Sequence, residues 1–327
     1  MIRLGLQIPN FTYPGVADED LFDAVANVAA TAEQSGFDSI FVMDHFYQLP
    51  LLGAADAYML EAYTLLGALA ARTKTARLGT LVTGVTYRNP AELAKEVTTL
   101  DILSKGRAIL GIGAAWHDVE HEALGFDFPP VKERMDRLEE ALQICRAMFR
   151  GERPTIDGRY YQVKDAINSP LPIQKDLPIM IGGSGEKRTL KLVAQYADAV
   201  NLIAGRAELP HKIDVLAKHC ADFGRDVATI NKTWLATAMV GSTPAEAEAL
   251  RDAKVREMGF PSWGEVDDAT KAMIGDRMMV GSPEQLAEQV ASLLGLGLDG
   301  VILNFPANGA DADAIASAGR AISAAIA

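Results

Sequence analysis

The sequence has few of the residues that stabilise small secreted domains or bind polyanions. Only two of its 327 residues are cysteines, too few for a disulfide framework or a cysteine-based metal cage. The 31 basic residues are outnumbered by 43 acidic ones, and the net charge of −12 argues against a broad nucleic-acid or anionic-membrane surface. No uncharged apolar run reaches the roughly 18 residues that a membrane helix needs, and residues 1–9 are too short for a signal peptide. We therefore expect a cytoplasmic protein without nucleic-acid or membrane partners.

Short apolar segments alternate with helix-like segments along the whole chain. The apolar segments are rich in β-branched residues and nearly continuous, which is typical of parallel strands covered by helices. Eight such units predict an α/β fold, a single (β/α)8 TIM barrel over residues 1–327, with short insertions after the fourth and seventh strands. The second insertion is placed at residues 259–277, and an open doubly wound sheet is the alternative. The predicted strands are residues 2–8, 39–43, 76–84, 107–112, 178–181, 199–203, 233–240 and 300–303. The predicted helices include residues 20–35, 56–72, 131–150, 186–196 and 209–223, with capping sequences at Asn89, Thr243 and Ser282 opening three others.

Two polar residues directly follow the second predicted strand, at the barrel end where active sites lie. They are Asp44 and His45. Histidine is the side chain that titrates near neutrality without perturbation, so His45 is a candidate proton donor or acceptor. The alternative is a histidine that caps a loop or packs on Phe46 and Tyr47.

A glycine-rich segment follows the fifth predicted strand and opens a helix. Successive backbone N–H groups in Gly182, Gly183 and Ser184, with a helix dipole behind them, suit a phosphate. The alternative is a tight strand-to-helix turn in which Ser184 is the N-cap.

Three further patterns are weaker. Gly111 and Gly113 begin a dinucleotide fingerprint, but Trp116 takes the place of the third glycine, so that interpretation fails. His117, Glu120 and His121 match the H-x-x-E-H spacing of a zinc peptidase, yet a surface helix also produces this spacing, and we expect no metal. Trp116, Tyr47 and Tyr87 would either form an aromatic wall around a planar ligand or cover the barrel mouth.

Eight collinear segments together resemble the luciferase-like flavin and deazaflavin oxidoreductases, and most closely their branch that uses coenzyme F420. The matching segments are residues 4–10, 36–46, 78–90, 110–116, 158–161, 178–183, 281–285 and 300–304. This resemblance implies an oxidoreductase that transfers a hydride between a small organic substrate and F420, and a homodimer. It also implies a non-prolyl cis peptide at Leu81–Val82.

The resemblance further implies the roles of individual residues. His45 is expected to be the catalytic acid or base, with Asp44 beside it, and Tyr47 and Trp116 are expected in the substrate pocket. The expected cofactor-binding residues are Asp44, His45, Leu81, Val82, Thr83, Gly113, Ala114, Ala115, Gly182, Gly183 and Ser184. Trp116 stands where a sugar-phosphate dehydrogenase of this family carries an acid, which favours a less polar substrate than a sugar phosphate.

Two other functions use the same barrel. One is an FMN-dependent monooxygenase that consumes oxygen and receives reduced flavin from a separate reductase. The other is a flavin-binding or assembly protein that catalyses no reaction.

Overall fold

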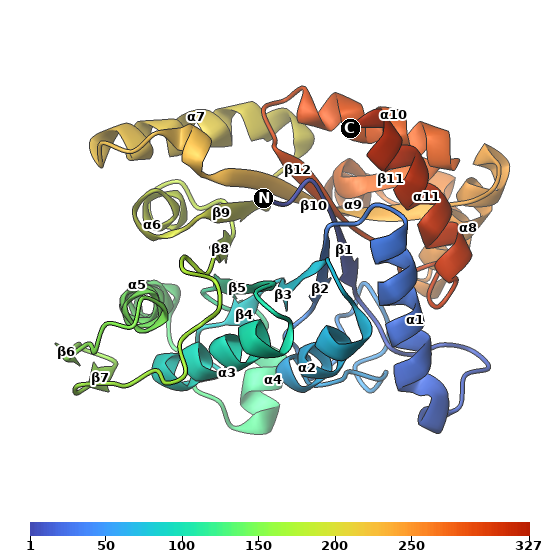
Figure 1. The fold of residues 1–327 in the computed structure, drawn as a ribbon. Helices are drawn as coiled ribbons and strands as arrows, with labels where there is room; N and C mark the ends of the chain where they lie inside the picture. The colour runs from blue at the N-terminus through green and yellow to red at the C-terminus, as the bar shows by residue number, and fades with distance from the viewer.

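Parallel strands alternate with helices from the first residues of the chain to the last (Figure 1). The computed structural model describes residues 1–327, apart from the side chain of Met273. The strands are β1 (Leu4–Ile8), β2 (Ser39–Val42), β3 (Arg77–Thr80), β4 (Thr83–Gly84), β5 (Ala108–Gly113), β6 (Ile156–Asp157), β7 (Gln162–Val163), β8 (Ile179–Gly182), β9 (Ala199–Leu202), β10 (Asn231–Val240), β11 (Met278–Gly281) and β12 (Gly300–Asn304). The helices are α1 (Leu21–Gln34), α2 (Ala62–Arg72), α3 (Pro90–Leu103), α4 (Asp118–Leu124), α5 (Val131–Phe149), α6 (Thr189–Tyr196), α7 (Leu209–Asp222), α8 (Pro244–Glu257), α9 (Asp268–Ile274), α10 (Pro283–Leu294) and α11 (Ala312–Ala325).

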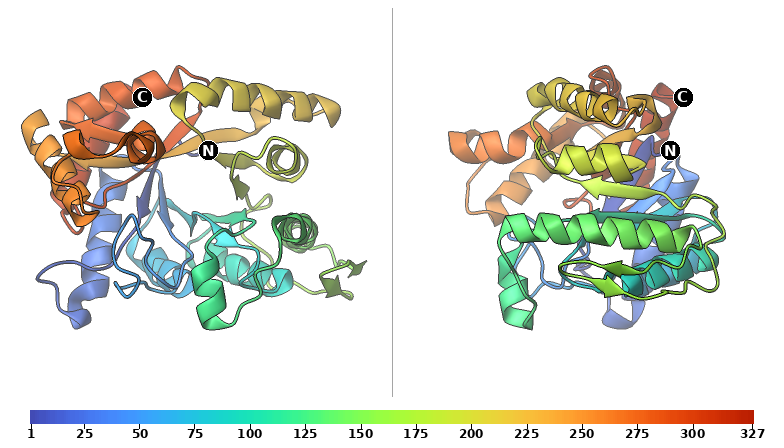
Figure 2. Two further views of the ribbon diagram at one scale, coloured as in Figure 1. Left: turned by 180° about the vertical axis from the view of Figure 1, so that it is seen from behind. Right: turned by 90° about the vertical axis from the view of Figure 1, so that its left-hand side faces the viewer.

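The main sheet closes on itself. Its hydrogen-bonded order runs from β10 through β12, β1, β2, β3, β5, β8 and β9, and β9 pairs again with β10. All of these pairs are parallel, and helices surround the strands in the views of Figure 2. The predicted (β/α)8 barrel is thus confirmed, and the open doubly wound alternative is wrong.

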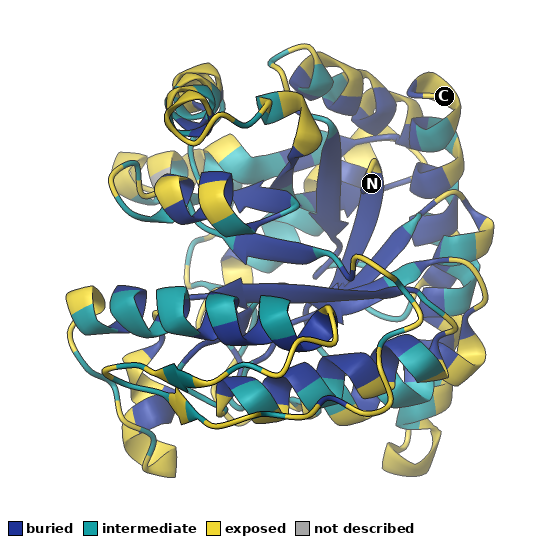
Figure 3. Ribbon diagram, turned by 60° about the vertical axis from the view of Figure 1, so that its left-hand side comes forward, coloured by how far each residue is buried: buried dark blue, intermediate teal, exposed yellow. Residues whose placement is uncertain are grey.

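Side chains alternate between two buried environments along the strands. In β2, Ile40 and Val42 pack outward against the helices, whereas Phe41 belongs to a second apolar cluster inside the barrel. The same cluster holds Ile109, Met180 and Ile302. Figure 3 shows the strands of the barrel mostly buried, with the exposed residues on the outer helices and loops. Both faces of the sheet are therefore covered, which explains the continuous apolar character of the strand sequences.

Several predicted boundaries differ from the structure. The predicted strand 76–84 is divided into β3 and β4, which flank the cis peptide between Leu81 and Val82. Helix α2 begins at Ala62 rather than at residue 56, and α6 begins at Thr189 rather than at residue 186. Strand β11, which was not predicted, follows the insertion at residues 259–277 and pairs with the second half of β10.

The capping predictions are confirmed to different degrees. Ser282 forms a complete capping box with Gln285. The Thr243 hydroxyl accepts from the Glu246 N–H, but the Glu246 carboxylate turns to the N–H of Ser242 instead of completing the box. The Asn89 side chain caps α3 by accepting the N–H of Ala91. Pro90, which lies between them, has no N–H that would need a cap. Local hydrogen bonds thus define the starts of these helices.

Among the helices described, none is long and apolar enough to cross a membrane.

Candidate functional site

His45 lies just beyond β2, at the carboxyl-terminal end of the barrel, and contacts a buried carboxylate. Its Nδ1 is 2.6 Å from Oε1 of Glu120, which lies in α4 and is fully buried. The other carboxylate oxygen accepts the backbone N–H groups of Phe46 and Tyr47, at 2.8 and 3.2 Å. Burial opposes ionisation, but the hydrogen bonds from His45, Tyr87 and Phe46 lower the pKa of Glu120 to about 2. Glu120 is therefore an ionised acceptor at neutral pH.

Aromatic side chains pack around Glu120, the partner of His45. The Tyr87 hydroxyl donates to Glu120 Oε1, and its ring stacks on His121 with centroids 4.6 Å apart. His121 is fully buried, and its ring nitrogens lie 2.6 Å from the His117 carbonyl oxygen and 2.6 Å from the Thr86 hydroxyl. Glu120 and both nitrogens of His121 are thus engaged within the protein, which is not the geometry of the zinc-peptidase alternative.

The aromatic residues that were considered as one wall are divided among three environments. Tyr87 bonds to Glu120 and stacks on His121, as described above. Trp116 is 61% exposed at the rim and meets the His45 ring edge-on at a centroid distance of 5.8 Å. Tyr47 instead lines a separate hollow of about 740 Å³ together with Phe46 and Leu21. Of the two residues expected in the substrate pocket, only Trp116 contacts the His45 ring in the described interactions.

Asp44 is held by an arginine that the sequence reasoning did not single out. Arg88 forms two hydrogen bonds with the two carboxylate oxygens of Asp44, at 2.6 and 3.1 Å. The same guanidinium pairs with Glu61 at 2.8 Å and with Glu96 at 3.1 Å. Burial raises the pKa of Asp44, while Arg88 acts in the opposite direction. Burial likewise raises the pKa of Glu96 to about 7. One cation therefore pairs with three acidic groups, of which Asp44 directly precedes His45 in the chain.

The carboxyl ends of β3 and β4 form a bulge. The Leu81–Val82 peptide is cis, as the resemblance implied. The Val82 side chain lies so near Gly113 and Gly182 that a Cβ at either position would come within about 3.0 Å of it. The Leu81 carbonyl accepts a hydrogen bond from Gln7 at 3.2 Å. Thr83 lies beneath the bulge, where its hydroxyl meets those of Tyr63 and Thr80 at 2.8 and 2.9 Å.

The loop after β5 contains a residue with an unusual backbone conformation. Ala115 has a φ of 59°, in the left-handed region that residues other than glycine rarely adopt. Its carbonyl accepts from Arg134 of α5 at 2.9 Å, which fixes this turn from outside the barrel. Ala114 precedes it and packs against the outer core. Arg134 was missed by the sequence reasoning because it is one of several basic residues in an amphipathic helix.

The glycine-rich segment after β8 has free backbone donors, but they begin later than predicted. Gly182 ends β8, and the Gly183 N–H already donates to the Asn201 carbonyl at 2.9 Å. The Ser184 hydroxyl accepts from the N–H of Ile203 instead of capping the helix, so the N-cap alternative is wrong. The N–H groups of residues 184–188 have no acceptor within the described part of the chain. These N–H groups directly precede the N-terminus of α6, where the helix dipole favours a bound anion.

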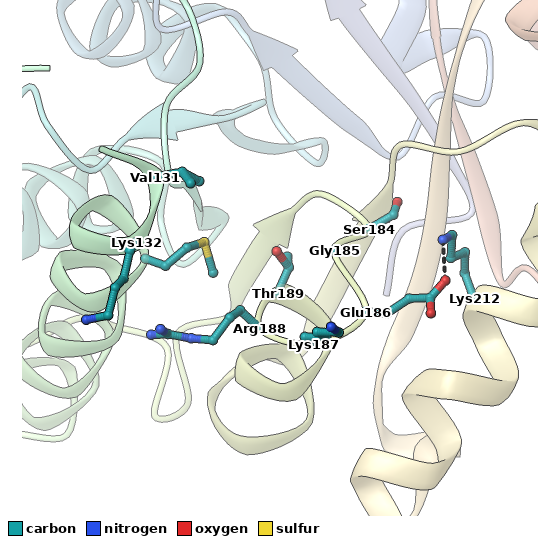
Figure 4. Close-up of a pocket in the computed structure, with 10 residues that line it drawn as sticks. Val131, Lys132, Ser184, Gly185, Glu186, Lys187, Arg188, Thr189 and Lys212 are labelled. Carbon is teal, nitrogen blue, oxygen red and sulfur yellow. Dashed lines mark hydrogen bonds and ion pairs between the residues drawn. The ribbon is translucent and has the colours of Figure 1, made fainter. Parts of the chain in front are cut away.

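A cavity of about 560 Å³ borders these free amides (Figure 4). Lys132 reaches it from α5, and Lys212 reaches it from α7. Most cations around it are already paired, since Lys212 binds Glu186 at 2.6 Å, and Lys132 and Arg188 bind Asp136. Lys187 lines the cavity without an ion pair among the described residues. The cavity therefore combines free N–H donors with one uncompensated cation.

Comparisons with known proteins agree with this architecture. The family model described as luciferase-like monooxygenase matches residues 2–300. An F420-dependent glucose-6-phosphate dehydrogenase from Beutenbergia cavernae is 28% identical over 336 residues, covering 94% of this chain and 92% of the relative. A protein of the same description from Microbacterium testaceum is 34% identical over 197 residues, or 60% of this chain and 57% of the relative. The structure of an F420-dependent secondary alcohol dehydrogenase, in complex with an F420–acetone adduct, has a TM-score of 0.76 at 22% identity, covering 97% of this chain and 99% of that one.

Proposed function

The chain belongs to the luciferase-like monooxygenase family, and from this premise we propose that it transfers a hydride between a small organic substrate and coenzyme F420. The cofactor is suggested by the relatives, since the one matched over 94% of this chain is described as F420-dependent. A dehydrogenase of this kind needs a group that exchanges a proton with the substrate and a site that holds the anionic part of the cofactor.

The observation that carries the proposal is that one end of the barrel has both features. His45 follows β2, and no partner for its Nε2 is found among the described residues. The free N–H groups of residues 184–188 follow β8, at the same end of a parallel barrel. A phosphate would accept hydrogen bonds from these amides, with Lys187 nearby.

The remaining expected residues define where the ring of the cofactor would be held. We assign this role to the bulge at Leu81–Val82, to Gly113 opposite it, and to the half-buried residues Ala114 and Ala115. When bound, the deazaflavin would accept or donate a hydride at its C5 carbon. His45 would take the substrate's proton at Nε2 during oxidation and return it during reduction.

The substrate class is part of the proposal. Trp116 places a large exposed apolar surface beside the His45 ring. An uncharged, partly apolar alcohol suits this rim better than a sugar phosphate does. The proposed site therefore differs in substrate from the glucose-6-phosphate dehydrogenases to which the chain is similar.

A second function is favoured by the family description itself, which names a monooxygenase. In that case the same anion site would hold FMN, and a separate reductase would supply it in reduced form. Oxygen would then be consumed, which F420-dependent hydride transfer does not require.

The decisive experiment titrates the purified protein with oxidised F420 and, in parallel, with FMN, and follows ligand fluorescence. Turnover is then measured as the loss of oxidised F420 absorbance with a secondary alcohol or with glucose 6-phosphate. We expect selective F420 binding and faster reduction with the alcohol. Faster reduction with glucose 6-phosphate would overturn the substrate class but not the cofactor. Selective FMN binding with substrate-dependent oxygen consumption would replace the proposal by the second function. Binding without any turnover would favour the non-catalytic alternative.

A further inference from the structure

The Glu120 carboxylate faces His45 from a position 75 residues further along the chain, and every hydrogen-bonding direction it has is used. Oε2 accepts the backbone N–H groups of Phe46 and Tyr47. Oε1 faces Nδ1 of His45 and also accepts from the Tyr87 hydroxyl. A carboxylate has about four acceptor sites in total, so these four contacts occupy all of them.

The direction of each hydrogen bond follows from the chemistry of the donors. A backbone N–H only donates, so Oε2 of Glu120 is committed as an acceptor. The three donors other than His45, which are the N–H groups of Phe46 and Tyr47 and the Tyr87 hydroxyl, favour the ionised carboxylate, and this form has no hydrogen of its own to give. The 2.6 Å contact with Nδ1 of His45 is therefore a bond that His45 donates. In the neutral imidazole, Nε2 is then the bare nitrogen.

We propose that Glu120 is a positioning residue that fixes His45 in the Nδ1–H tautomer and so leaves Nε2 as the proton acceptor. The proposal rests on the function proposed above for His45, because the tautomer matters for catalysis only if His45 exchanges a proton with the substrate. The rings of Trp116 and His117 meet His45 edge-on at 5.8 Å and form no hydrogen bond with its nitrogens in the described residues. Glu120 is thus the one group found to select the tautomer in the part of the chain that the structure describes.

Glu120→Gln changes this selection with almost no change of shape. The amide oxygen must take the place of Oε2, because two backbone donors would otherwise face an NH₂ group. The NH₂ group then faces His45 and donates to Nδ1. The variant therefore moves the proton of the neutral ring to Nε2, where it blocks proton acceptance.

The first measurement needs no cofactor. Protein labelled with ¹⁵N-histidine is examined by long-range ¹H–¹⁵N correlation at a pH where the imidazoles are neutral, and the His45 signal is assigned by its loss in His45→Gln. We expect the Nδ1–H pattern in the wild type and the Nε2–H pattern in Glu120→Gln. His121 serves as an internal reference, because its Nδ1 donates to the His117 carbonyl and must keep its hydrogen in both proteins.

The second measurement is turnover with F420 and alcohol. We expect Glu120→Gln to lower kcat by about 10²–10⁴-fold, as expected when an acid–base histidine is held in the wrong tautomer, with F420 affinity changed less than about threefold. Glu122→Gln is the matched control, since it makes the same substitution in α4 at an exposed position and should retain wild-type turnover.

The proposal is overturned if wild-type His45 shows the Nε2–H pattern, a result that needs no folded variant. It is also overturned if Glu120→Gln keeps the Nδ1–H pattern, or if the tautomer changes while kcat does not. Absence of F420 binding would count against the proposed function alone, because the tautomer is measured on the protein without cofactor.

Discussion

At the scale of single residues, the site depends on side chains whose partners fix their protonation or orientation. Nδ1 of His45 lies 2.6 Å from Oε1 of Glu120, and Asp44 is held by Arg88. Neither acidic residue is exposed, so each depends on a partner within the protein.

Replacing His45 tests its chemical role. We expect His45→Gln to lower kcat by about 10²–10⁴-fold, because a positioned acid–base group contributes about that much to a proton transfer. F420 affinity should change little, because the proposed anion site lies beyond β8. Stopped-flow measurement of F420 reduction and a fluorescence titration check both parts. Wild-type turnover in this variant would contradict the assignment of His45.

The pKa of Glu120 predicts how stability depends on pH. Burial raises this pKa, but the hydrogen bonds from His45 and Tyr87 outweigh burial and hold it at about 2, against an ordinary value of 4.5. A lowered carboxyl pKa stabilises the folded state above about pH 4.5, and that contribution is lost as the pH falls towards 2. The difference corresponds to about 3 kcal/mol at most. The Glu120→Gln variant has no carboxyl group at this position, so its stability lacks this pH-dependent contribution.

Urea denaturation at several pH values between 7 and 3 measures this effect. The wild type should be more stable than Glu120→Gln at pH 7, and the gap in free energy of unfolding should narrow below pH 4.5. A gap that is constant over this range would show that the folded and unfolded pKa values of Glu120 do not differ.

At the scale of elements, the barrel end is shaped by close approach of neighbouring strands. The chain of β5 passes so near β3 that a Cβ on Gly111 would overlap the carbonyl oxygen of Thr80. The same glycine carbonyl accepts the Thr80 hydroxyl at 2.9 Å. This approach places β4 and its bulge against Gly113, so the position of the proposed cofactor surface depends on a residue without a side chain.

Gly111→Ala should therefore reduce the free energy of unfolding by about 3 kcal/mol or more, since the overlap is with backbone and not with a flexible side chain. The control is Gly67→Ala within α2, where a Cβ would lie 3.8 Å from Leu103, an ordinary contact. That variant should gain about 0.5–1 kcal/mol, as alanine is favoured over glycine inside helices. The change in free energy of unfolding of each variant is measured by chemical denaturation. Equal stability of the two variants would contradict the packing at Gly111.

At the scale of the whole molecule, the proposed ligand spans several elements of the barrel. The bulge belongs to β3 and β4, whereas the free amides follow β8 and precede α6. A ligand that contacts both stabilises the closed barrel relative to the unfolded chain, because only the folded chain brings these segments together. The homodimer implied by the resemblance stays a prediction, to be tested by light scattering.

We expect F420 at a concentration of 100 times its Kd to add about 2.7 kcal/mol to the stability, and to raise the Tm by a few degrees. FMN at the same concentration should raise the Tm less. Differential scanning fluorimetry at a series of ligand concentrations gives the comparison. A larger shift with FMN would contradict the choice of cofactor and support the monooxygenase function.

Much of the architecture was predictable because it depends on local pattern. Continuous apolar strands, helices with a buried face and capping residues such as Ser282 are properties of short segments, and they predicted the barrel and its order. The placement of His45 at a strand end followed from that order. The extra strand β11 was missed because its four residues follow an insertion without a repeating pattern.

The partners of the site residues, by contrast, were decided by the tertiary structure. Glu120 had the spacing of a metal-dependent base, yet the barrel brings it to His45 across 75 residues. Arg88 was not singled out in the sequence, because no local pattern shows that its guanidinium contacts the buried Asp44. The sequence by itself determined which residues stand at the carboxyl ends of the strands, because strand order and side-chain alternation are local. Only the closed barrel determined which of them touch, because a hydrogen bond depends on ångström distances between segments that no local pattern relates.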